Sequence, residues 1–402
     1  MQNLFNISNR LLDAVEIKFH RYLYDIIDWN DRLVLIKGAR GTGKTTMLLQ
    51  CIKETYGHSP DALYASCDNF WFSDNKILDL VEYHYTHGGK HLFLDEIHLY
   101  EGKWQQELKN IYDSYPGYKV TFTGSSMIHL DNAIADLSRR CLPYNLSGLS
   151  FREYLKFKEV ADLPSFSLEK IVDKSHAAEY EILQSLPEDK RILSLFEEYI
   201  GKGYYPFFYQ SDGGNYYGRI ERMLDVSIMR DFPAVTSIEY ETLLKIKKLL
   251  YVMSREFPFQ LNVLSLSNSI GVSRNSVVRM FDLLSRSAIL RCLDNGWRSP
   301  KSVAKPSKIL FDNVDIMSAL TGLTEKGTVR ETFAASMLSV NHQLYEPPVG
   351  DLLVDERYLF EIGGRSKKFK QIADLPNSFV LEDDIETGFG HKIPLWLIGF
   401  LY

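Results

Sequence analysis

The sequence has few cysteines, and their arrangement excludes two classes of protein. Only four occur in 402 residues, and none lies in a Cys-x-x-Cys pair or near a histidine at metal-ligand spacing. This argues against a zinc site and against a secreted domain framed by disulfides. We expect all four to be buried, reduced thiols: Cys51, Cys67, Cys141 and Cys292.

A basic excess and a long hydrophobic run are also missing. Lys and Arg number 46 against 52 Asp and Glu, a formal net charge of −6, so any surface for nucleic acid must be local. No run reaches the roughly 18 uninterrupted apolar residues of a membrane span. Residues 1–19 lack the basic-then-apolar order of a signal peptide. These features predict a cytoplasmic, globular protein of two or three domains.

Short apolar runs rich in β-branched and aromatic residues recur through the first 150 residues, separated by stretches with helical spacing. Fully apolar strands are typical of a parallel sheet covered by helices on both faces, because each strand is then buried on both sides. The N-terminal third is therefore predicted to be an α/β domain. We expect its strands at residues 32–37, 62–67, 91–95, 119–123 and 142–146.

The pattern changes near Phe151, where strand signals disappear for nearly a hundred residues. Helical spacing predicts helices at 154–158, 179–186, 190–199 and 219–228. Residues 241–293 are again mainly helical, and mixed α and β signals resume after a polar, Pro-containing segment. We predict four regions, with boundaries at 1–150, 151–240, 241–300 and 301–402, the last a smaller α/β or α+β domain.

Residues 38–45 read Gly-Ala-Arg-Gly-Thr-Gly-Lys-Thr and match the phosphate-binding pattern G-x-x-x-x-G-K-[ST] at every specified position. The glycines let the backbone curl so that N–H groups converge on a phosphate at a helix N-terminus. Lys44 would reach the β- and γ-phosphates, and Thr45 would place its hydroxyl on Mg²⁺. The flanking strand and helix favour this function over a glycine-rich turn. The predicted nucleotide-binding residues are Gly38, Arg40, Gly41, Thr42, Gly43, Lys44, Thr45 and Thr46.

The second element of the predicted nucleotide site is acidic. It lies one or two βα units downstream, where the apolar run His91-Leu-Phe-Leu ends in Asp95 and Glu96. Ligands of open α/β sheets bind at the carboxyl ends of the strands, so this position suits a carboxylate. We predict that Asp95 holds the Mg²⁺ shell and that Glu96 polarises the attacking water as general base. ATP is the expected nucleotide, because the N-K-x-D pattern that reads guanine is missing downstream of Asp95.

Two further elements have open interpretations. The strand at 119–123 ends in Gly124-Ser125-Ser126, where Ser125 would sense the γ-phosphate or orient the water; a plain Gly-Ser turn is the alternative. Arg139 and Arg140 precede the last strand. One of them would act as an arginine finger, in cis or across a subunit interface, and a solvated arginine pair is the competing interpretation.

These residues together resemble a known family, the prokaryotic AAA-like P-loop ATPases with a C-terminal domain of unknown function. The resemblance implies an additional-strand P-loop fold with the lysine strand central, a helical lid at 151–240, a winged helix at 241–300 and a restriction-endonuclease-like tail at 301–402. It implies that Arg140 is the arginine finger of the family. Arg139 stands where the family usually has glycine, and Ala39 replaces a common proline. The resemblance rests on residues 38–46, 94–96, 104–113, 123–126, 140–153, 199–206, 229–231 and 308–312.

The winged-helix region carries a local basic excess. Residues 265–279 predict a helix, a tight turn at Gly271, Ser273 as N-cap and a second helix. That second helix would turn Arg274, Asn275 and Arg279 outward, toward a DNA groove. Residues 274–308 hold eight Lys or Arg against two Asp, which favours nucleic-acid contact. Alternatively, the helices pack on a neighbouring domain and bind nothing.

The C-terminal region has an incomplete nuclease pattern. Glu331, Asp351 and Glu361 resemble a metal site that requires an aspartate followed by Glu-x-Lys, but Gly363 occupies the lysine position. Lys367 or Lys368 would substitute only by reaching back from a following loop. We therefore expect a degenerate scaffold.

Three functions are compatible with these features. The leading prediction is an ATPase that hydrolyses ATP with Mg²⁺ to drive a conformational switch. The second is an ATP-switched DNA-binding regulator or defence-type module with little turnover, and the third is a metal-dependent nuclease. The expected partners are ATP, an unidentified protein and, in the second case, DNA bound through the winged helix, while the oligomeric state stays open.

Overall fold

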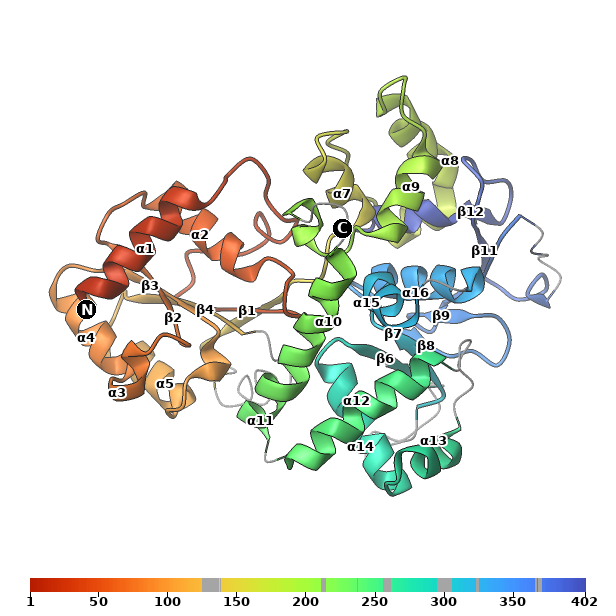
Figure 1. The fold of residues 1–402 in the computed structure, drawn as a ribbon. Helices are drawn as coiled ribbons and strands as arrows, with labels where there is room; N and C mark the ends of the chain where they lie inside the picture. Colours follow the sequence, from red (N-terminus) through yellow and green to blue (C-terminus); the bar gives the residue numbers. More distant parts are fainter. Residues whose placement is uncertain are drawn as a thin grey trace. The chain divides into compact units, whose positions relative to one another are not determined.

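The computed structural model divides into two compact units, shown in Figure 1. Unit 1 consists of Met1–Ser147 and Asp225–Glu239, and unit 2 of Gly148–Leu224 and Tyr240–Tyr402. The structure describes residues 1–124, 137, 139–210, 215–236, 238–255, 262–294, 306–322, 325–365, 367 and 371–402.

Unit 1 is built on a five-stranded parallel sheet with the order β2-β3-β4-β1-β5. All five strands predicted from the sequence are present, within one residue or so of the expected ends. An additional strand, β4, lies between β1 and β3, as the family resemblance implies. β1 lies inside the sheet, second from the β5 edge, rather than at its centre. The strands are β1 Leu33–Lys37, β2 Ala62–Ser66, β3 His91–Asp95, β4 Lys119–Gly124 and β5 Leu142–Asn145.

Helices cover both faces of this sheet (Figure 1). Alternate residues of β1 point to opposite faces, so Leu33 and Leu35 join one hydrophobic cluster and Val34 and Ile36 the other. α4 and α5 cover the first face and α2 the second, which explains why β1 is apolar at four successive positions, Leu33 to Ile36. The helices are α1 Gln2–Ala14, α2 Lys44–Thr55, α3 Trp71–Asp74, α4 Ile77–Thr86, η1 Ile97–Leu99 and α5 Trp104–Ser114.

A distant segment of the chain completes unit 1. Residues 225–239 begin with the last two residues of α10 (Tyr216–Val226), form the π-helical turn η3 (Ser227–Asp231) and continue as α11 (Phe232–Val235), which contacts η1. The predicted helical region 151–240 is therefore shared between the two units, because these residues pack with the sheet of unit 1.

Unit 2 begins with helices, as the sequence predicts. Ser150 caps α7 in a capping box with Glu153. α13 ends at Gly271 with φ +76°, and the Ser273 side chain accepts a hydrogen bond from the Ser276 N–H at the start of α14, which is the predicted turn and cap. The helices are α7 Phe151–Phe157, α8 Leu168–Ser185, α9 Ile192–Gly201, η2 Pro206–Gln210, α12 Tyr240–Arg255, α13 Val263–Ile270, α14 Arg274–Arg286, α15 Val314–Thr321 and α16 Lys326–Leu338.

Two sheets belong to unit 2. β6 and β7 pair antiparallel, and the second sheet has the order β12-β11-β10-β9-β8, in which β10, β11 and β12 are parallel and β8 and β9 antiparallel. α16 packs against β10. The elements are β6 Leu290–Leu293, β7 Lys308–Phe311, β8 Leu344–Tyr345, β9 Leu352–Val354, β10 Tyr358–Gly363, β11 Ser378–Glu382, β12 Lys392–Pro394 and η5 Leu395–Phe400.

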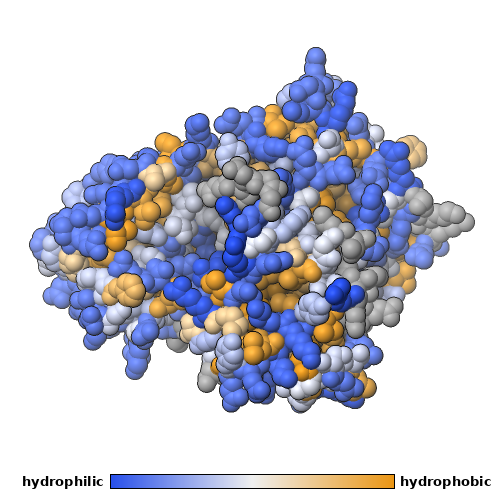
Figure 2. Space-filling view, in the orientation of Figure 1, coloured by the Kyte–Doolittle hydropathy of each residue, from blue (hydrophilic) through white to orange (hydrophobic). Residues whose placement is uncertain are grey.

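The surface is mixed in character. On the face shown in Figure 2, hydrophobic residues lie in separate groups among hydrophilic ones. Within the described ranges, none of the helices combines the length and the hydrophobicity that a bilayer crossing demands. Scattered apolar side chains of this kind are ordinary on a protein surface.

Candidate functional site: the P-loop and the end of β3

The loop between β1 and α2 has the tight backbone that its glycines predict. Gly41 and Gly43 adopt φ values of +83° and +98°, which side chains with a Cβ rarely reach. A Cβ on Gly38 would lie 2.3 Å from the Leu146 carbonyl oxygen. Gly43 is the N-cap of α2, so the first N–H groups of that helix face the loop, in the arrangement that binds phosphate.

Lys44 is the first residue of α2 and is only 4% exposed. Its ammonium donates hydrogen bonds to the carbonyl oxygens of Gly38 and Ala39, each at 2.8 Å. Burial lowers the pKa of Lys44, and the negative charges of Glu96 and Asp95 act in the opposite direction. A cation is thus held inside the curl of the loop by neutral carbonyl groups.

Asp95 ends β3 beside this loop and is buried. Its Oδ2 accepts hydrogen bonds from the Thr45 hydroxyl at 2.6 Å and from the Tyr64 hydroxyl at 2.9 Å, and its Oδ1 accepts one from the Thr123 hydroxyl. Burial and then the charge of Glu96 raise the pKa of Asp95, while these hydrogen bonds lower it. The carboxylate is therefore fixed next to the P-loop hydroxyl of Thr45.

Glu96 follows in a strained backbone conformation, with φ +53°. Its carboxylate lies 3.4 Å from His98 Nδ1 and 3.9 Å from the Arg40 guanidinium. Asp231 of η3 joins both neighbours, since it accepts hydrogen bonds from Arg40 at 3.0 and 3.2 Å and lies 3.6 Å from His98 Nε2. Burial would raise the pKa of Asp231, but hydrogen bonds from His98 and Arg40 outweigh it and the pKa is lowered.

Most of the predicted nucleotide-site residues thus occupy one place. Thr42 and Lys44 are buried, Thr45 is half-buried, and Thr46 is exposed on the first turn of α2. Ser125 lies outside the described residues. The remaining predicted residue, Arg140, lies elsewhere: it donates to Asp113 of α5 at 3.0 and 3.2 Å.

The position of Arg140 follows from strand register. β5 runs parallel to β1 with Leu142 opposite Val34, so Arg140 precedes the amino end of β5. The P-loop follows the carboxyl end of β1. Arg140 lies at the amino ends of the parallel strands, whereas the P-loop of the same chain lies at their carboxyl ends.

Comparisons with known proteins agree with this geometry. Residues 30–155 match the model of a family described as an AAA domain, and residues 193–327 match a domain of unknown function (DUF8612). Residues 30–155 are thus an AAA domain of the P-loop ATPase type. It is 31% identical over 328 residues to the uncharacterized protein MJ1637 of Methanocaldococcus jannaschii, covering 77% of this chain. The chain spans 66% of the length of that relative.

Two solved structures are distantly similar to this chain. The Walker-type ATPase PABY2304 of Pyrococcus abyssi covers 77% of this chain and 99% of its own, with 12% identity and a TM-score of 0.41. A RuvB variant of Thermotoga maritima covers 77% and 92%, with 14% identity and a TM-score of 0.32.

Five residues of this AAA-like site were not predicted from the sequence. Tyr64 and Thr123 hold Asp95, and His98 and Asp231 surround Glu96. Arg21 is buried and donates to the carbonyl oxygens of Thr42 and Ser147, so it ties the P-loop to the end of β5. None carries a local sequence signal, except that Thr123 and Asp231 lie in the stretches 123–126 and 229–231 quoted for the family resemblance.

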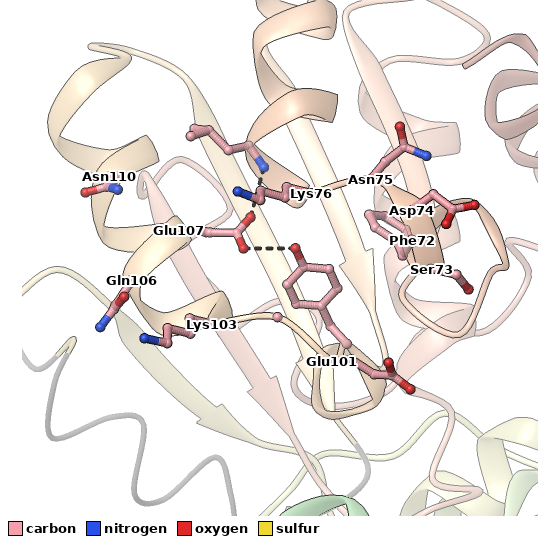
Figure 3. Close-up of a pocket in the computed structure, with 13 residues that line it drawn as sticks. Phe72, Ser73, Asp74, Asn75, Lys76, Glu101, Lys103, Gln106, Glu107 and Asn110 are labelled. Carbon is pink, nitrogen blue, oxygen red and sulfur yellow. Dashed lines mark hydrogen bonds between the residues drawn. The ribbon is translucent and has the colours of Figure 1, made fainter.

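A cavity of about 530 Å³ lies elsewhere in unit 1 (Figure 3). It is lined by residues from α3 to the start of α4, by the loop before α5 and by Gln106 and Asn110 of α5. Glu107 accepts a hydrogen bond from the Tyr100 hydroxyl at 2.9 Å and one from the Leu78 N–H at 3.1 Å. No residue of the predicted nucleotide site lines it. A phosphate bound by backbone N–H groups needs a loop rather than a deep cavity, so the P-loop stays the predicted nucleotide site.

In unit 2, α14 presents the predicted basic side chains to solvent. Arg274, Asn275 and Arg279 are exposed, while the opposite face buries Val277 and Phe281. The hairpin strands β6 and β7 follow this helix pair. The winged-helix assignment and DNA binding stay predictions.

Proposed function

We propose that this protein binds ATP with Mg²⁺ at the P-loop and hydrolyses it, and that turnover drives a conformational change. The observation that carries the proposal is the 2.6 Å hydrogen bond between Thr45 and Asp95. It joins the first turn of the phosphate-binding helix to the acidic end of β3. Lys44 and the N–H groups of the loop supply the positive potential that phosphate groups need.

The residues present suit Mg²⁺. Thr45 and Asp95 offer a hydroxyl and a carboxylate oxygen, the hard ligands that Mg²⁺ prefers. Within the described parts of the chain, no three His, Cys, Asp or Glu side chains come together to hold a metal. This agrees with an ion that completes its shell with water and substrate phosphate oxygens. When bound, the ion neutralises charge on the β- and γ-phosphates.

Glu96 is the proposed general base. Its side chain is 17% exposed, and it follows directly after the buried Asp95. His98 and Arg40 hold its carboxylate on the side of the P-loop. A positioned carboxylate that accepts a proton from water typically contributes on the order of 10²–10⁴-fold to a rate.

The test separates binding from turnover. Glu96→Gln should keep ATP affinity, measured by titration with a fluorescent ATP analogue, and lose phosphate release by a factor of about 10² or more. Glu101→Gln, an exposed glutamate five residues later, is the matched control and should behave as wild type. Phosphate release at the wild-type rate in Glu96→Gln would remove the general-base assignment.

We further propose that Asp231 and His98 position Glu96 and Arg40. Asp231 belongs to a segment whose flanking residues on both sides lie in unit 2, so the chain itself links this contact to the rest of the protein. Such a link supports a switch that senses the state of the nucleotide. Asp231→Asn should lower kcat about tenfold, as expected when a charged hydrogen bond worth about 1.5 kcal/mol is lost, and change affinity less.

The control for Asp231→Asn is Glu239→Gln, an exposed acid of the same segment. A purely structural role of Asp231 would lower thermal stability and leave the kcat of the remaining folded protein unchanged. If kcat and the ATP affinity of the folded protein fell by the same factor, that result would also contradict a positioning role.

The alternative is an ATP-switched DNA-binding regulator. The exposed row Arg274, Asn275 and Arg279 on α14 favours it. Neutralising Arg274 and Arg279 together should weaken duplex binding for unrelated sequences and flatten the slope of log K against log salt by about 0.9 per lost phosphate contact. Undetectable binding of the wild type to duplex DNA at low salt would eliminate this alternative.

A further inference from the structure

A second set of charged side chains converges in unit 2, at the paired strands β9 and β10. Asp351 immediately precedes β9, and its Oδ2 accepts a hydrogen bond from the Ile362 N–H of β10 at 2.6 Å. Glu361 is on β10 itself. The Lys367 ammonium lies 2.8 Å from Glu361 Oε1 and 3.7 Å from Asp351 Oδ2. A positive charge thus lies between two carboxylates that strand pairing brings together.

Glu361 carries more negative charge than its contacts satisfy. The residue is only 3% exposed. One carboxylate oxygen faces Lys367, and the other, Oε2, has no hydrogen-bond partner among the described residues. A buried carboxylate oxygen without a partner is costly and calls for an ion or water molecule. Glu361 Oε2 is therefore available to a cation or an ordered water.

Lys367 takes the place of the lysine that the strand lacks. A Cβ built on Gly363 would lie 2.6 to 2.8 Å from the Cβ, Cγ and Cδ atoms of Lys367. The stem of Lys367 therefore lies directly over Gly363, and only glycine leaves room for it. The missing lysine at 363 and the lysine at 367 are one feature: the charge arrives from the following loop instead of the strand.

A second acid and lysine flank this cluster. Glu331 of α16 forms an ion pair with Lys308 of β7 at 2.6 Å, and Lys308 also donates to the Asp351 carbonyl oxygen at 3.4 Å. Two lysines and three carboxylates thus belong to one region. A small oxygen-preferring ion that keeps most of its water needs only one or two of these carboxylates, together with substrate phosphate oxygens.

We propose that Asp351 and Glu361 bind a divalent cation, with Lys367 as the adjacent positive charge, and that the site hydrolyses a phosphodiester of nucleic acid. A water oxygen bonds to phosphorus as the bond from phosphorus to one ester oxygen breaks. The attacking water releases its proton to solvent, and the leaving oxygen takes a proton from a water on the ion. The products are a phosphate monoester and an alcohol. Lys367 stabilises the negative charge of the transferring phosphate.

Metal binding is the first test, with the full-length protein stripped of metal by EDTA and no nucleotide present. Isothermal titration with Mn²⁺ should detect a site whose affinity falls at least tenfold in Glu361→Gln and in Asp351→Asn. The matched control is Glu198→Gln, since Glu198 forms an exposed pair with Lys158. An affinity equal to wild type in both variants, or no binding by the wild type, overturns the proposal.

Cleavage is the second test, with end-labelled DNA and RNA oligonucleotides of matched sequence, Mn²⁺ and no ATP. Cleavage of either nucleic acid that is lost at least tenfold in Lys367→Ala and kept in Lys158→Ala supports the proposal. Adding Gly363→Lys to Lys367→Gly should restore part of the rate, because the glycine removes the Cβ that would lie 2.8 Å from the new Cβ at 363, and an ammonium then reaches the same carboxylates from the strand. Metal binding without cleavage of either substrate by the wild type overturns the hydrolytic role. Because ATP is absent throughout, these outcomes are independent of the proposed ATPase.

Discussion

Each of the two units contains a buried or half-buried lysine beside the end of a strand, yet the two lysines have opposite surroundings. Lys44 donates to two neutral carbonyl oxygens of its own loop, so its charge stays available to an anion. Lys367 lies against the carboxylates of Glu361 and Asp351, so its charge is already compensated. The first site is suited to phosphate and the second to a cation that shares the carboxylates.

The largest expected effect tests whether the anion site is complete within one chain. Arg140→Ala should lower ATP turnover by a factor on the order of 10³, the contribution of an arginine finger, with little change in ATP affinity. Arg140 and the P-loop of its own chain lie at opposite ends of the parallel strands. The arginine would therefore act on a neighbouring molecule. Mixing Arg140→Ala with Lys44→Ala protein should then restore phosphate release.

Arg139→Ala, at the exposed neighbouring position, is the control for this experiment and should turn over as wild type. Unchanged turnover in Arg140→Ala would return Arg140 to a surface ion pair with Asp113.

The next effect is smaller and concerns the lysine of the anion site. Lys44→Ala should weaken ATP binding by about 100-fold, because a charged hydrogen bond worth about 3 kcal/mol is lost. Fluorescent-nucleotide titration measures it. Lys53→Ala is the control, since Lys53 lies on the same helix and also donates to a carbonyl oxygen, that of Val15, at 2.8 Å. Mn²⁺ binding at Asp351 and Glu361 should not change in Lys44→Ala.

A third comparison uses the glycines beside the two lysines. A Cβ at position 38 would meet the Leu146 backbone, whereas at 363 it would meet the side chain of Lys367. Gly38→Ala should therefore cost about 1–3 kcal/mol in the free energy of unfolding, as overpacking does. Gly363→Ala should cost less, about 1 kcal/mol, because the loop that carries Lys367 can shift, whereas the Lys367 Cβ, 2.8 Å from the added Cβ, does not move with the rotamer.

Urea denaturation measures both changes, and Gly201→Ala, with no atom within 4 Å of its Cβ, should be close to neutral. Equal destabilisation by the first two variants would show that Lys367 is rigidly held.

The last comparison is a pH dependence that belongs to unit 2 alone. Burial raises the pKa of Asp315 to about 7, although hydrogen bonds from the Tyr216 hydroxyl and the Tyr204 N–H lower it. The folded state therefore binds more protons than the unfolded state between pH 4 and 7. The free energy of unfolding should fall as pH rises through that window, by at most about 1.4 kcal/mol per unit, and level off above it.

Urea denaturation of Asp315→Asn from pH 4 to 8 should show this slope removed, while Asp189→Asn, at an exposed position, should keep it. A slope unchanged in Asp315→Asn would mean that the aspartate is ionised throughout this range.

The sequence was sufficient to predict the sheet of unit 1 and the meeting of Lys44, Thr45 and Asp95 at the P-loop. These residues are neighbours in the chain or lie at the end of an apolar strand. It was not sufficient for contacts between distant residues. Asp231 contacts Arg40, which is 191 residues away in the sequence, and Arg21 contacts Ser147, which is 126 residues away. The periodicity of hydrophobic residues does not predict contacts between residues so far apart. The position of Lys367 over Gly363 depends on how a loop folds back, which spacing alone does not determine.

The path of the chain through the two units has a consequence for dissecting the protein. The chain leaves unit 1 after Ser147, returns at Asp225 and leaves again after Glu239. A fragment that ends at Ser147 would retain Lys44, Asp95 and Glu96 but would lose Asp231, the anion that Arg40 binds. Expressing the ATP-binding part as one continuous stretch of gene therefore cannot yield the intact unit. A faithful minimal version needs residues 225–239 returned to it, by fusion or as a separate peptide.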